Sequence, residues 1–169
     1  MKSSSVAADW GRIAHDRQEV ADALHRWAMG IDTNNADLFA SAVTEDVVVD
    51  FSKVGRKTGL DFPPIEGRDV VVGGFLASMG PLDTTHSVSN LRIAVEGDAA
   101  TLAAQVLGRH FPPGEGAKPD HERQFISMNL FEGELVRSGD TWRFARLAVD
   151  NAWSEGDPGV LATGADAHP

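Results

Sequence analysis

The order of apolar and polar positions divides the chain into a helical first half and a stranded second half. Apolar residues recur at spacings of three and four near the start, which predicts a helix over residues 16–34. The apolar stripe of this helix consists of Val20, Leu24, Trp27 and Ile31. Two shorter helices are predicted at 36–43, where Asn35 can cap the first turn, and at 69–79. A dense run of valines predicts a strand over 47–51.

Long strands dominate the second half of the chain. Alternating apolar positions predict strands over 84–96, 99–111, 123–137 and 141–153. The stretches 53–66 and 112–121 contain several Pro and Gly residues and are predicted loops. Helices followed by a meander predict the α+β class. We expect a cone-shaped α+β barrel in which three N-terminal helices pack on a strongly curved mixed or antiparallel sheet around a cavity.

The length of 169 residues fits a single domain, which we place at 16–153. The polar, serine-rich start predicts a flexible N-terminal arm over 1–15. The end of the chain, 154–169, is rich in Gly, Ala, Asp and Pro and is predicted to be a flexible tail, in which Val160 and Leu161 could fold back onto the body.

Charge and composition narrow the choice of partners. Acidic residues outnumber basic ones by 25 to 15, which disfavours nucleic acids and anionic membranes as partners. Because the chain has no Cys, disulfides, thiolate catalysis and Cys-based zinc sites are excluded. The start is not typical of a secretion signal, and the longest apolar run is too short to span a bilayer. We therefore expect a cytoplasmic protein whose partner is a small molecule.

Two of the six histidines lie on predicted strands. His110 shares its strand face with small or apolar residues, so it should point inward. His86 has the wrong parity for the inward face of its strand, and a bulge near 87–90 would turn it inward. The other four, His15, His25, His121 and His168, are expected to be solvated.

Asp32 lies at the end of the first helix, beside its buried stripe, where a carboxylate must be paired or hydrated. An Asp that accepts a hydrogen bond from a His ring fixes the tautomer and makes the other ring nitrogen more basic. Asp32 and His86 are therefore a candidate general base, although a purely structural pair is an alternative of similar weight. Asp32, His86 and His110 lack the paired spacing of zinc sites, so no metal is expected.

The third long strand supplies a candidate wall for a ligand pocket. Phe125, Ser127, Asn129 and Phe131 share one face, where two aromatic rings offer apolar area and two polar groups offer orientation. Two further candidates for substrate binding are Trp153, at the end of the fourth strand, and Asp50, although Asp50 fits a strand-end turn better than a catalytic role.

The motifs of the chain resemble a known family over about residues 16–153. Asp16-Arg17 opens the first helix, Asp32 ends it, and Thr85-His86 precedes Ser89-Asn90-Leu91-Arg92. In this order they resemble the SnoaL-like branch of the nuclear-transport-factor-2-like superfamily, with similarity to scytalone dehydratase and hexachlorocyclohexane dehydrochlorinase. The resemblance implies a cone-shaped fold, no cofactor, and a homo-oligomer, a trimer before a dimer.

The resemblance also implies roles for single residues. Asp32 matches the Asp that orients the catalytic His, and His86 matches the His that removes a proton during elimination. His110 matches a second pocket His, and Ser127 and Asn129 match a Ser-x-Asn pair. The tyrosines that hold a water in scytalone dehydratase have no counterpart, since Ile31 and Asp50 stand near those places.

Together these observations predict a cofactor-independent lyase or isomerase acting on a small, largely apolar ring compound. His86 would remove a carbon-bound proton, His110 would act as an acid or bind the departing group, and Ser127 and Asn129 would anchor a polar end of the substrate. The apolar body would pack on Phe125, Phe131 and Trp153. The alternatives are a polyketide cyclase, an epoxide hydrolase or a non-catalytic binding or assembly module. Epoxide opening would require Arg92, Arg109 or Arg146 beside Asp32.

Overall fold

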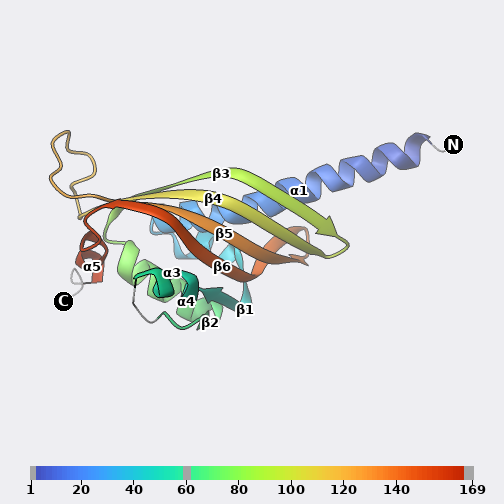
Figure 1. Cartoon of the computed structure of the whole chain (residues 1–169). Coiled ribbons are helices and arrows are strands. Elements are labelled where there is room, and N and C mark those ends of the chain that lie inside the picture. The colour runs from blue at the N-terminus through green and yellow to red at the C-terminus, as the bar shows by residue number, and fades with distance from the viewer. Residues whose placement is uncertain (1–2, 59–61, 166–169) are drawn as a thin grey trace.

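In the computed structural model, which describes residues 3–58 and 62–165, helices cover one face of a curved sheet (Figure 1). The helices are α1 (Ser3–Asp32), α2 (Ala36–Ser41), α3 (Ser52–Thr58), α4 (Arg68–Met79) and α5 (Val160–Ala165). The strands are β1 (Val43–Asp50), β2 (Ile65–Glu66), β3 (Asp83–Glu96), β4 (Ala99–Phe111), β5 (Phe125–Ser138) and β6 (Thr141–Gly156). The predicted α+β class is confirmed.

The sheet is mixed, with the order β2-β1-β6-β5-β4-β3. Strands β3 to β6 form the predicted antiparallel meander, whereas β1 pairs with β6 in parallel. The last strand of the chain therefore lies inside the sheet, between the first strand and β5. The register shifts within the β3–β4 and β5–β6 pairings, and such bulges bend a sheet and strengthen its twist.

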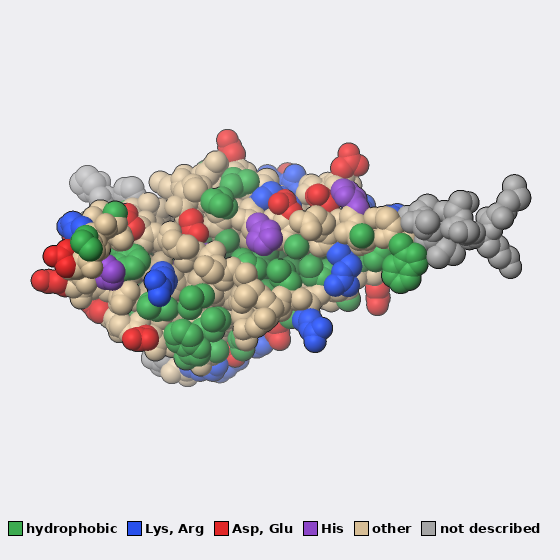
Figure 2. All heavy atoms as spheres, turned by 90° about the horizontal axis from the view of Figure 1, so that it is seen from above, with side chains coloured by type: hydrophobic (Ala, Val, Ile, Leu, Met, Phe, Trp, Pro, Cys, Tyr) green, Lys and Arg blue, Asp and Glu red, His purple; other side chains and the backbone are tan. Residues whose placement is uncertain are grey.

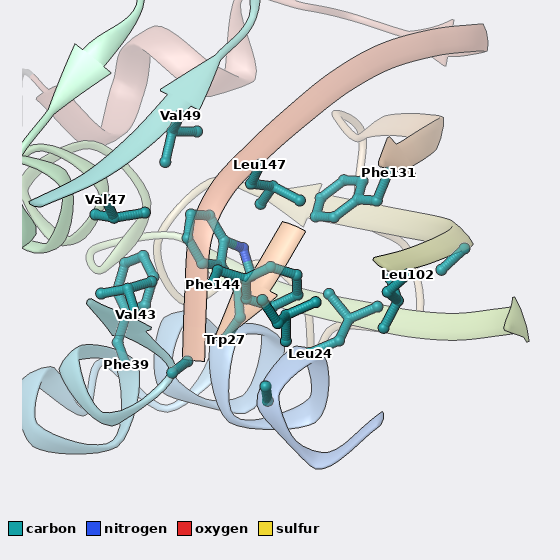
Figure 3. Packing of buried hydrophobic residues seen from close by; sticks show 14 of the residues in the cluster. Leu24, Trp27, Phe39, Val43, Val47, Val49, Leu102, Phe131, Phe144 and Leu147 are labelled. Carbon is teal, nitrogen blue, oxygen red and sulfur yellow. The ribbon is translucent and has the colours of Figure 1, made fainter. Parts of the chain in front are cut away.

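The core lies between α1 and the concave face of the sheet (Figure 3). All four residues of the predicted apolar stripe are buried. Trp27 packs edge-on against Phe39, with ring centroids 4.6 Å apart, and against Phe144 at 6.4 Å. Burying a large apolar side chain contributes about 1.5–3 kcal/mol, so this stripe holds α1 on the sheet.

A buried ion pair fixes the first half of α1 to the far end of the sheet. Asp16 is 1% exposed and accepts hydrogen bonds from both terminal nitrogens of Arg137, at 2.8 and 2.9 Å, and from Trp142 Nε1 at 3.4 Å. The Arg137 guanidinium also donates to Asp98 at 2.8 Å and lies 4.6 Å from the centroid of the Trp142 ring. The hydrogen bonds from Arg137 hold the pKa of Asp16 below its ordinary value, so this buried carboxylate is charged.

Within the described residues, regular structure extends further toward both termini than the sequence predicts. The segment 1–15 was expected to be a flexible arm, but α1 begins at Ser3 and extends past the end of the sheet (Figure 1). No proline interrupts residues 3–32, so the helical hydrogen bonding continues through this segment. The tail was expected to be flexible from residue 154, yet β6 continues to Gly156. Val160 is buried in α5, as expected if this part of the tail folds back onto the body.

The predicted loop over 53–66 is also partly wrong, because it contains α3 and the short strand β2. Asp50 Oδ1 accepts a hydrogen bond from the backbone N–H of Ser52 at 2.8 Å, and this contact starts the turn that leads into α3. An Asp side chain can accept a hydrogen bond from the backbone N–H two residues later, and this local contact starts a turn ahead of the first glycine. The Gly and Pro residues of 53–66 predicted an irregular loop and gave no sign of this contact.

On the face shown in Figure 2, acidic and basic side chains are interspersed around hydrophobic ones. The alternation of β4 and β5 predicts that Leu107, Ile126, Met128 and Leu130 face outward and could form an oligomer contact; Leu107 and Met128 are half-buried and Leu130 is exposed, whereas Ile126 is buried. The homo-oligomer stays a prediction. In the part of the chain that the structure describes, no helix is both long and apolar enough to cross a membrane.

Candidate functional site

The structure brings Asp32 and His86 into direct contact at the junction of α1 and β3. Asp32 Oδ1 lies 2.6 Å from His86 Nδ1 and accepts a hydrogen bond from Thr84 Oγ1 at 2.8 Å. Asp32 Oδ2 accepts from the backbone N–H of His86 at 2.7 Å. The carboxylate is therefore held at both oxygens, and the His86 ring is fixed to it at one nitrogen.

The environment of Asp32 keeps its carboxylate ionised. Burial alone would raise the pKa of Asp32, but the ring and backbone hydrogen bonds from His86, the charge of His86 and the Thr84 hydroxyl together lower it below the ordinary value. An ionised Asp32 can only accept hydrogen bonds. A neutral His86 ring must then carry its proton on Nδ1, which leaves a lone pair on Nε2.

A bulge in β3 explains how His86 reaches the inner face. The register between β3 and β4 shifts between Ser89 and Arg92, and Asn90 adopts a positive φ of 53°. Asn is one of the few residues that tolerate this left-handed conformation. The predicted bulge is confirmed, and it lets His86 share the interior with the apolar residues later in the strand.

His110 is buried beside His86, with 4% of its surface exposed. The two rings meet edge to face, with centroids 5.4 Å apart. His110 Nδ1 lies 3.1 Å from the backbone oxygen of Phe125, which can only accept, so Nδ1 carries the proton. Burial, together with the charge of His86, lowers the pKa of His110 to about 4. At neutral pH His110 is thus uncharged, and its Nε2 is a hydrogen-bond acceptor.

Gly108 makes the approach of the two histidines possible. This residue is the β-sheet partner of His86 on one side and of Ser127 on the other. A Cβ at this position would lie 2.8 Å from His110 Cε1 and 3.4 Å from His86 Nε2. The absence of a side chain at Gly108 therefore gives both rings their place above the strand.

The two hollows found on the described part of the chain are lined by neither His86 nor His110. Among the described residues, two buried side-chain polar atoms have no partner, Thr44 Oγ1 and Arg143 Nε. Neither histidine Nε2 is among these sealed atoms. A hollow of about 460 Å³ also reaches Asp32 from outside, between the end of α1, the start of β3 and Phe111. A second hollow, of about 660 Å³, lies on another part of the sheet, lined by residues such as Arg17, Thr101 and Arg146.

Ser127 and Asn129 lie together on the inner part of β5. Asn129 Nδ2 donates to Ser127 Oγ at 3.1 Å, and Asn151 Nδ2 of β6 donates to Asn129 Oδ1 at 3.1 Å. The Phe125 ring stands 5.9 Å from the His110 ring. Of the predicted substrate-binding residues, Phe125 thus lies beside His110. Ser127 and Asn129 belong to one hydrogen-bonded polar group on β5 and β6.

The other three predicted substrate-binding residues lie elsewhere. Trp153 is 48% exposed, because the register shift in the β5–β6 pairing places it opposite Met128, away from the interior. Phe131 is buried within the hydrophobic core. Asp50 accepts from the Ser52 backbone and pairs with Arg146 at 3.4 Å, which agrees with a strand-end role.

The arginines that epoxide opening would require are not beside Asp32. Arg146 pairs with Asp50, while Arg92 and Arg109 are exposed. Within the described ranges, the side chains that hydrogen-bond to the Asp32 carboxylate are those of Thr84 and His86.

Two residues at the site were not singled out from the sequence. Thr84 shares a strand face with His86, and this two-residue spacing is a usable signal. Asn151 reaches Asn129 only because the pairing of β5 with β6 shifts register between Met128 and Asn129, and the sequence pattern gives no sign of that shift.

The low pKa of His110 predicts a pH dependence of stability. Because the folded state holds His110 neutral down to about pH 4 while the unfolded chain takes up a proton near the ordinary His pKa of 6.5, the unfolded state binds more protons between these values. Lowering the pH from 7 to 5 should therefore remove about 2 kcal/mol of stability through His110.

Urea unfolding of the wild type and of His110→Gln at pH 7 and pH 5 measures this contribution. The variant should lose about 2 kcal/mol less than the wild type over that interval. Asp32 does not obscure the comparison, because its pKa is already below the ordinary value and its protonation lies at more acidic pH. Parallel losses in the two proteins would show that His110 is protonated in the folded state.

Comparison with known proteins adds a family and several relatives. A family model described as a SnoaL-like domain matches residues 12–148. Terrestric acid biosynthesis cluster protein E of Penicillium crustosum is 32% identical over 149 residues, which cover 86% of this chain and 89% of that protein.

Two solved structures show the same fold. The hexachlorocyclohexane dehydrochlorinase LinA-type3 from Novosphingobium barchaimii is 19% identical, with a TM-score of 0.69 over 90% of this chain and 96% of that one. A proposed scytalone dehydratase from Novosphingobium aromaticivorans is 16% identical, with a TM-score of 0.66 over 93% and 92%. Both kinds of enzyme named by the sequence resemblance are therefore structural neighbours of this chain.

Proposed function

The chain belongs to the SnoaL-like domain family, and from this premise we propose that it is a cofactor-independent lyase or isomerase that removes a carbon-bound proton. The observation that carries the proposal is the 2.6 Å contact between Asp32 Oδ1 and His86 Nδ1. This contact directs the lone pair of a neutral His86 ring to Nε2, beside Gly108 and His110. A general base positioned in this way contributes about 10²–10⁴-fold to a rate.

The proposed reaction begins with proton transfer from carbon to His86 Nε2. The electron pair of the broken C–H bond forms a carbon–carbon double bond as a leaving group departs, or moves onto an adjacent carbonyl oxygen in an isomerisation. Asp32 stabilises the resulting imidazolium through the hydrogen bond at Nδ1. The imidazolium then gives its proton to a leaving hydroxyl, which departs as water, to another carbon in an isomerisation, or to solvent when a halide leaves.

His110 is better suited to accept a hydrogen bond than to donate a proton. The sequence left both roles open, acid or ligand of the departing group. With its pKa lowered to about 4 and its Nδ1 proton directed to Phe125, His110 offers only the Nε2 lone pair at neutral pH. In the proposed reaction His110 therefore orients a substrate hydroxyl.

Four observations support a small ring compound as the substrate. Phe125 supplies an aromatic surface next to His110, and the polar atoms of Ser127 and Asn129 are few and grouped. The relative of 32% identity is named for a biosynthesis cluster, and a structural neighbour is named for a chlorinated ring compound. Ring closure of a polyketide could start from the same proton abstraction and would be separated from elimination by its product.

Hydrogen–deuterium exchange tests the proposed base without knowledge of the natural substrate. The probe is 2-tetralone, a bicyclic ketone with acidic C–H bonds beside its carbonyl, in deuterated buffer at neutral pH. Proton NMR should show loss of the α-proton signals about 10²–10⁴-fold faster with the wild type than with His86→Gln at equal protein concentration.

His121→Gln is the matched control, because His121 lies in the loop after β4 and contacts the Lys118 backbone and the Phe111 ring. It should exchange the probe as fast as the wild type. Equal rates for the wild type and His86→Gln, with the ketone shown to bind both proteins, would mean that the Asp32–His86 pair is structural and that the chain is a binding module.

A further inference from the structure

The first turns of α1 project beyond the end of the sheet that the rest of the helix covers (Figure 1). Residues 10–15 are exposed, whereas Asp16 is buried, and we call the helical residues 3–15 the overhang. A helix of this length is about 20 Å long. Most of the overhang lies outside the match to the family model, which begins at residue 12, so it is a feature of this chain rather than of the family.

The overhang continues the apolar stripe of α1 past the sheet. Ile13 lies two helical turns before Val20, and Trp10 lies one turn before Ile13, so both residues stand on the side of α1 that faces the core. Val20 is fully buried, but Trp10 is 67% exposed and Ile13 is 37% exposed. A large aromatic side chain in this position is expected to pack on a surface that its own sheet does not reach.

The outer face of the sheet contains a hollow of about 660 Å³ that no helix covers in the described part of the chain. It lies over two rows of directly paired residues that cross β3 to β6. One row is Arg92, Ala103, Glu132 and Ala148, and the other is Ala94, Thr101, Glu134 and Arg146. Leu102, between the rows on β4, points into the core, so the rows face the opposite way. We call this recess the outer hollow.

The outer hollow suits the overhang in shape and in charge. Its floor consists of small side chains, which leave room for an indole ring, and the exposed Arg92 at its rim can stack on the face of Trp10. Glu134 offers a negative charge to Arg12, whose side chain is 59% exposed and only 3.9 Å from Asp16. Because a net charge of −10 makes copies of the chain repel each other, a contact between them needs local opposite charges of this kind.

We propose that the overhang of one copy of this chain lies in the outer hollow of a second copy, with Trp10 on the floor of small residues. The overhang cannot enter the outer hollow of its own chain, because α1 lies on the inner face of the sheet and continues without a break from Ser3 to Asp32. The contact differs from the outward residues of β4 and β5 that the sequence predicted, and it does not depend on the proposed base.

Cross-linking between two single-cysteine variants tests the contact, since the chain has no Cys of its own. Ala14→Cys places a thiol beside Trp10 and Ile13 on the overhang, and Thr101→Cys places one in the outer hollow; both positions are exposed. The two proteins are refolded together from urea and treated with an equimolar short bis-maleimide. Mass spectrometry of the digested product identifies which residues are joined.

The link between residues 14 and 101 should form about 10²-fold faster than a link between unassociated proteins at about 10 µM, because docked thiols have an effective concentration in the millimolar range. Leu130→Cys in place of Thr101→Cys is the matched control. Leu130 is exposed on the same face of the sheet but does not line the outer hollow, so its link to residue 14 should form slowly.

Replacing Trp10 with alanine in the Ala14→Cys protein should weaken docking about 30-fold and bring the 14–101 link near the rate of the Leu130 control. Met29→Ala is the comparison, since Met29 is also an exposed apolar residue of α1, at 54%, but lies outside the overhang. It should leave the rate unchanged. Urea unfolding should show equal stability of the Trp10→Ala and wild-type folds, because the buried stripe and the Asp16–Arg137 pair are intact.

Three results would overturn the inference. Equal rates for the 14–101 and 14–130 links would mean that the overhang does not select the outer hollow. A faster link between two copies of residue 14 would mean that overhangs pair with each other. A 14–101 link that Trp10→Ala leaves unchanged would mean that the apolar face of the overhang does not make the contact.

Discussion

Replacing Asp32 with asparagine should slow exchange of the α-protons of 2-tetralone by about 10²–10⁴-fold and leave the fold intact. The amide of Asn can turn its amino group toward His86 Nδ1, which favours the tautomer whose Nε2 carries the proton and has no lone pair. The variant also lacks the negative charge that stabilises the imidazolium. Its remaining oxygen can still accept from either Thr84 or the His86 backbone, so the loss should be chemical rather than structural.

Asp83→Asn is the matched control for this prediction. Asp83 begins β3 at the same end of the sheet, and its carboxylate accepts the backbone N–H of Gly116 at 2.8 Å rather than the His86 ring. Exchange rates measured by NMR should be unchanged in Asp83→Asn. An Asp32→Asn protein as active as the wild type would show that His86 does not need its carboxylate partner.

Replacing Asp16 with alanine should lower the free energy of unfolding by about 2–4 kcal/mol. The substitution leaves the guanidinium of Arg137 without its bidentate partner and the buried indole N–H of Trp142 without an acceptor. The loss is expected below the upper range for buried pairs, because the Arg137 side chain is 26% exposed and can recover water. Urea unfolding at neutral pH measures the difference.

Asp98→Ala tests whether the loss of stability in Asp16→Ala depends on the burial of the carboxylate, because both carboxylates bind Arg137 but only Asp16 is buried. Asp98 also binds Arg137, at 2.8 Å, but its side chain is 84% exposed, so removing it should cost about 0–1 kcal/mol. Comparable losses for Asp16→Ala and Asp98→Ala would contradict the view that the buried carboxylate fixes α1 to the sheet.

The sequence predicts best those helices and strands in which apolar residues recur at a regular spacing. The stripe from Val20 to Ile31 and the alternation in β3 to β6 report burial on one face. The stripe is buried as predicted and the strand bounds agree to within three residues, whereas α1 begins at Ser3 instead of residue 16. The exceptions depend on contacts that no period encodes. Helix α3 starts at a hydrogen bond from the Ser52 backbone N–H to the Asp50 side chain. Helix α5 packs on α4, and Val160 is buried.

The site shows the same division between local and long-range information. Alternation alone orients His110, and the position of Asp32 at a helix end beside the core calls for a partner. The misplacement of Trp153 and the omission of Asn151 have one cause, the register shift between Met128 and Asn129. A one-residue slip exchanges the faces of a strand, and only the paired neighbour determines where it occurs.

The inner position of β6 has a consequence for how the chain is made. Val43 of β1 pairs with Phe144, about a hundred residues later, so during synthesis β1 must wait until β6 has left the ribosome. Until then its valine-rich edge and the edge of β5 are both unpaired, and open edges of this kind are sites of aggregation. Folding of this protein is thus a late event, completed by its last strand, and a nascent chain that ends before residue 141 should need a chaperone.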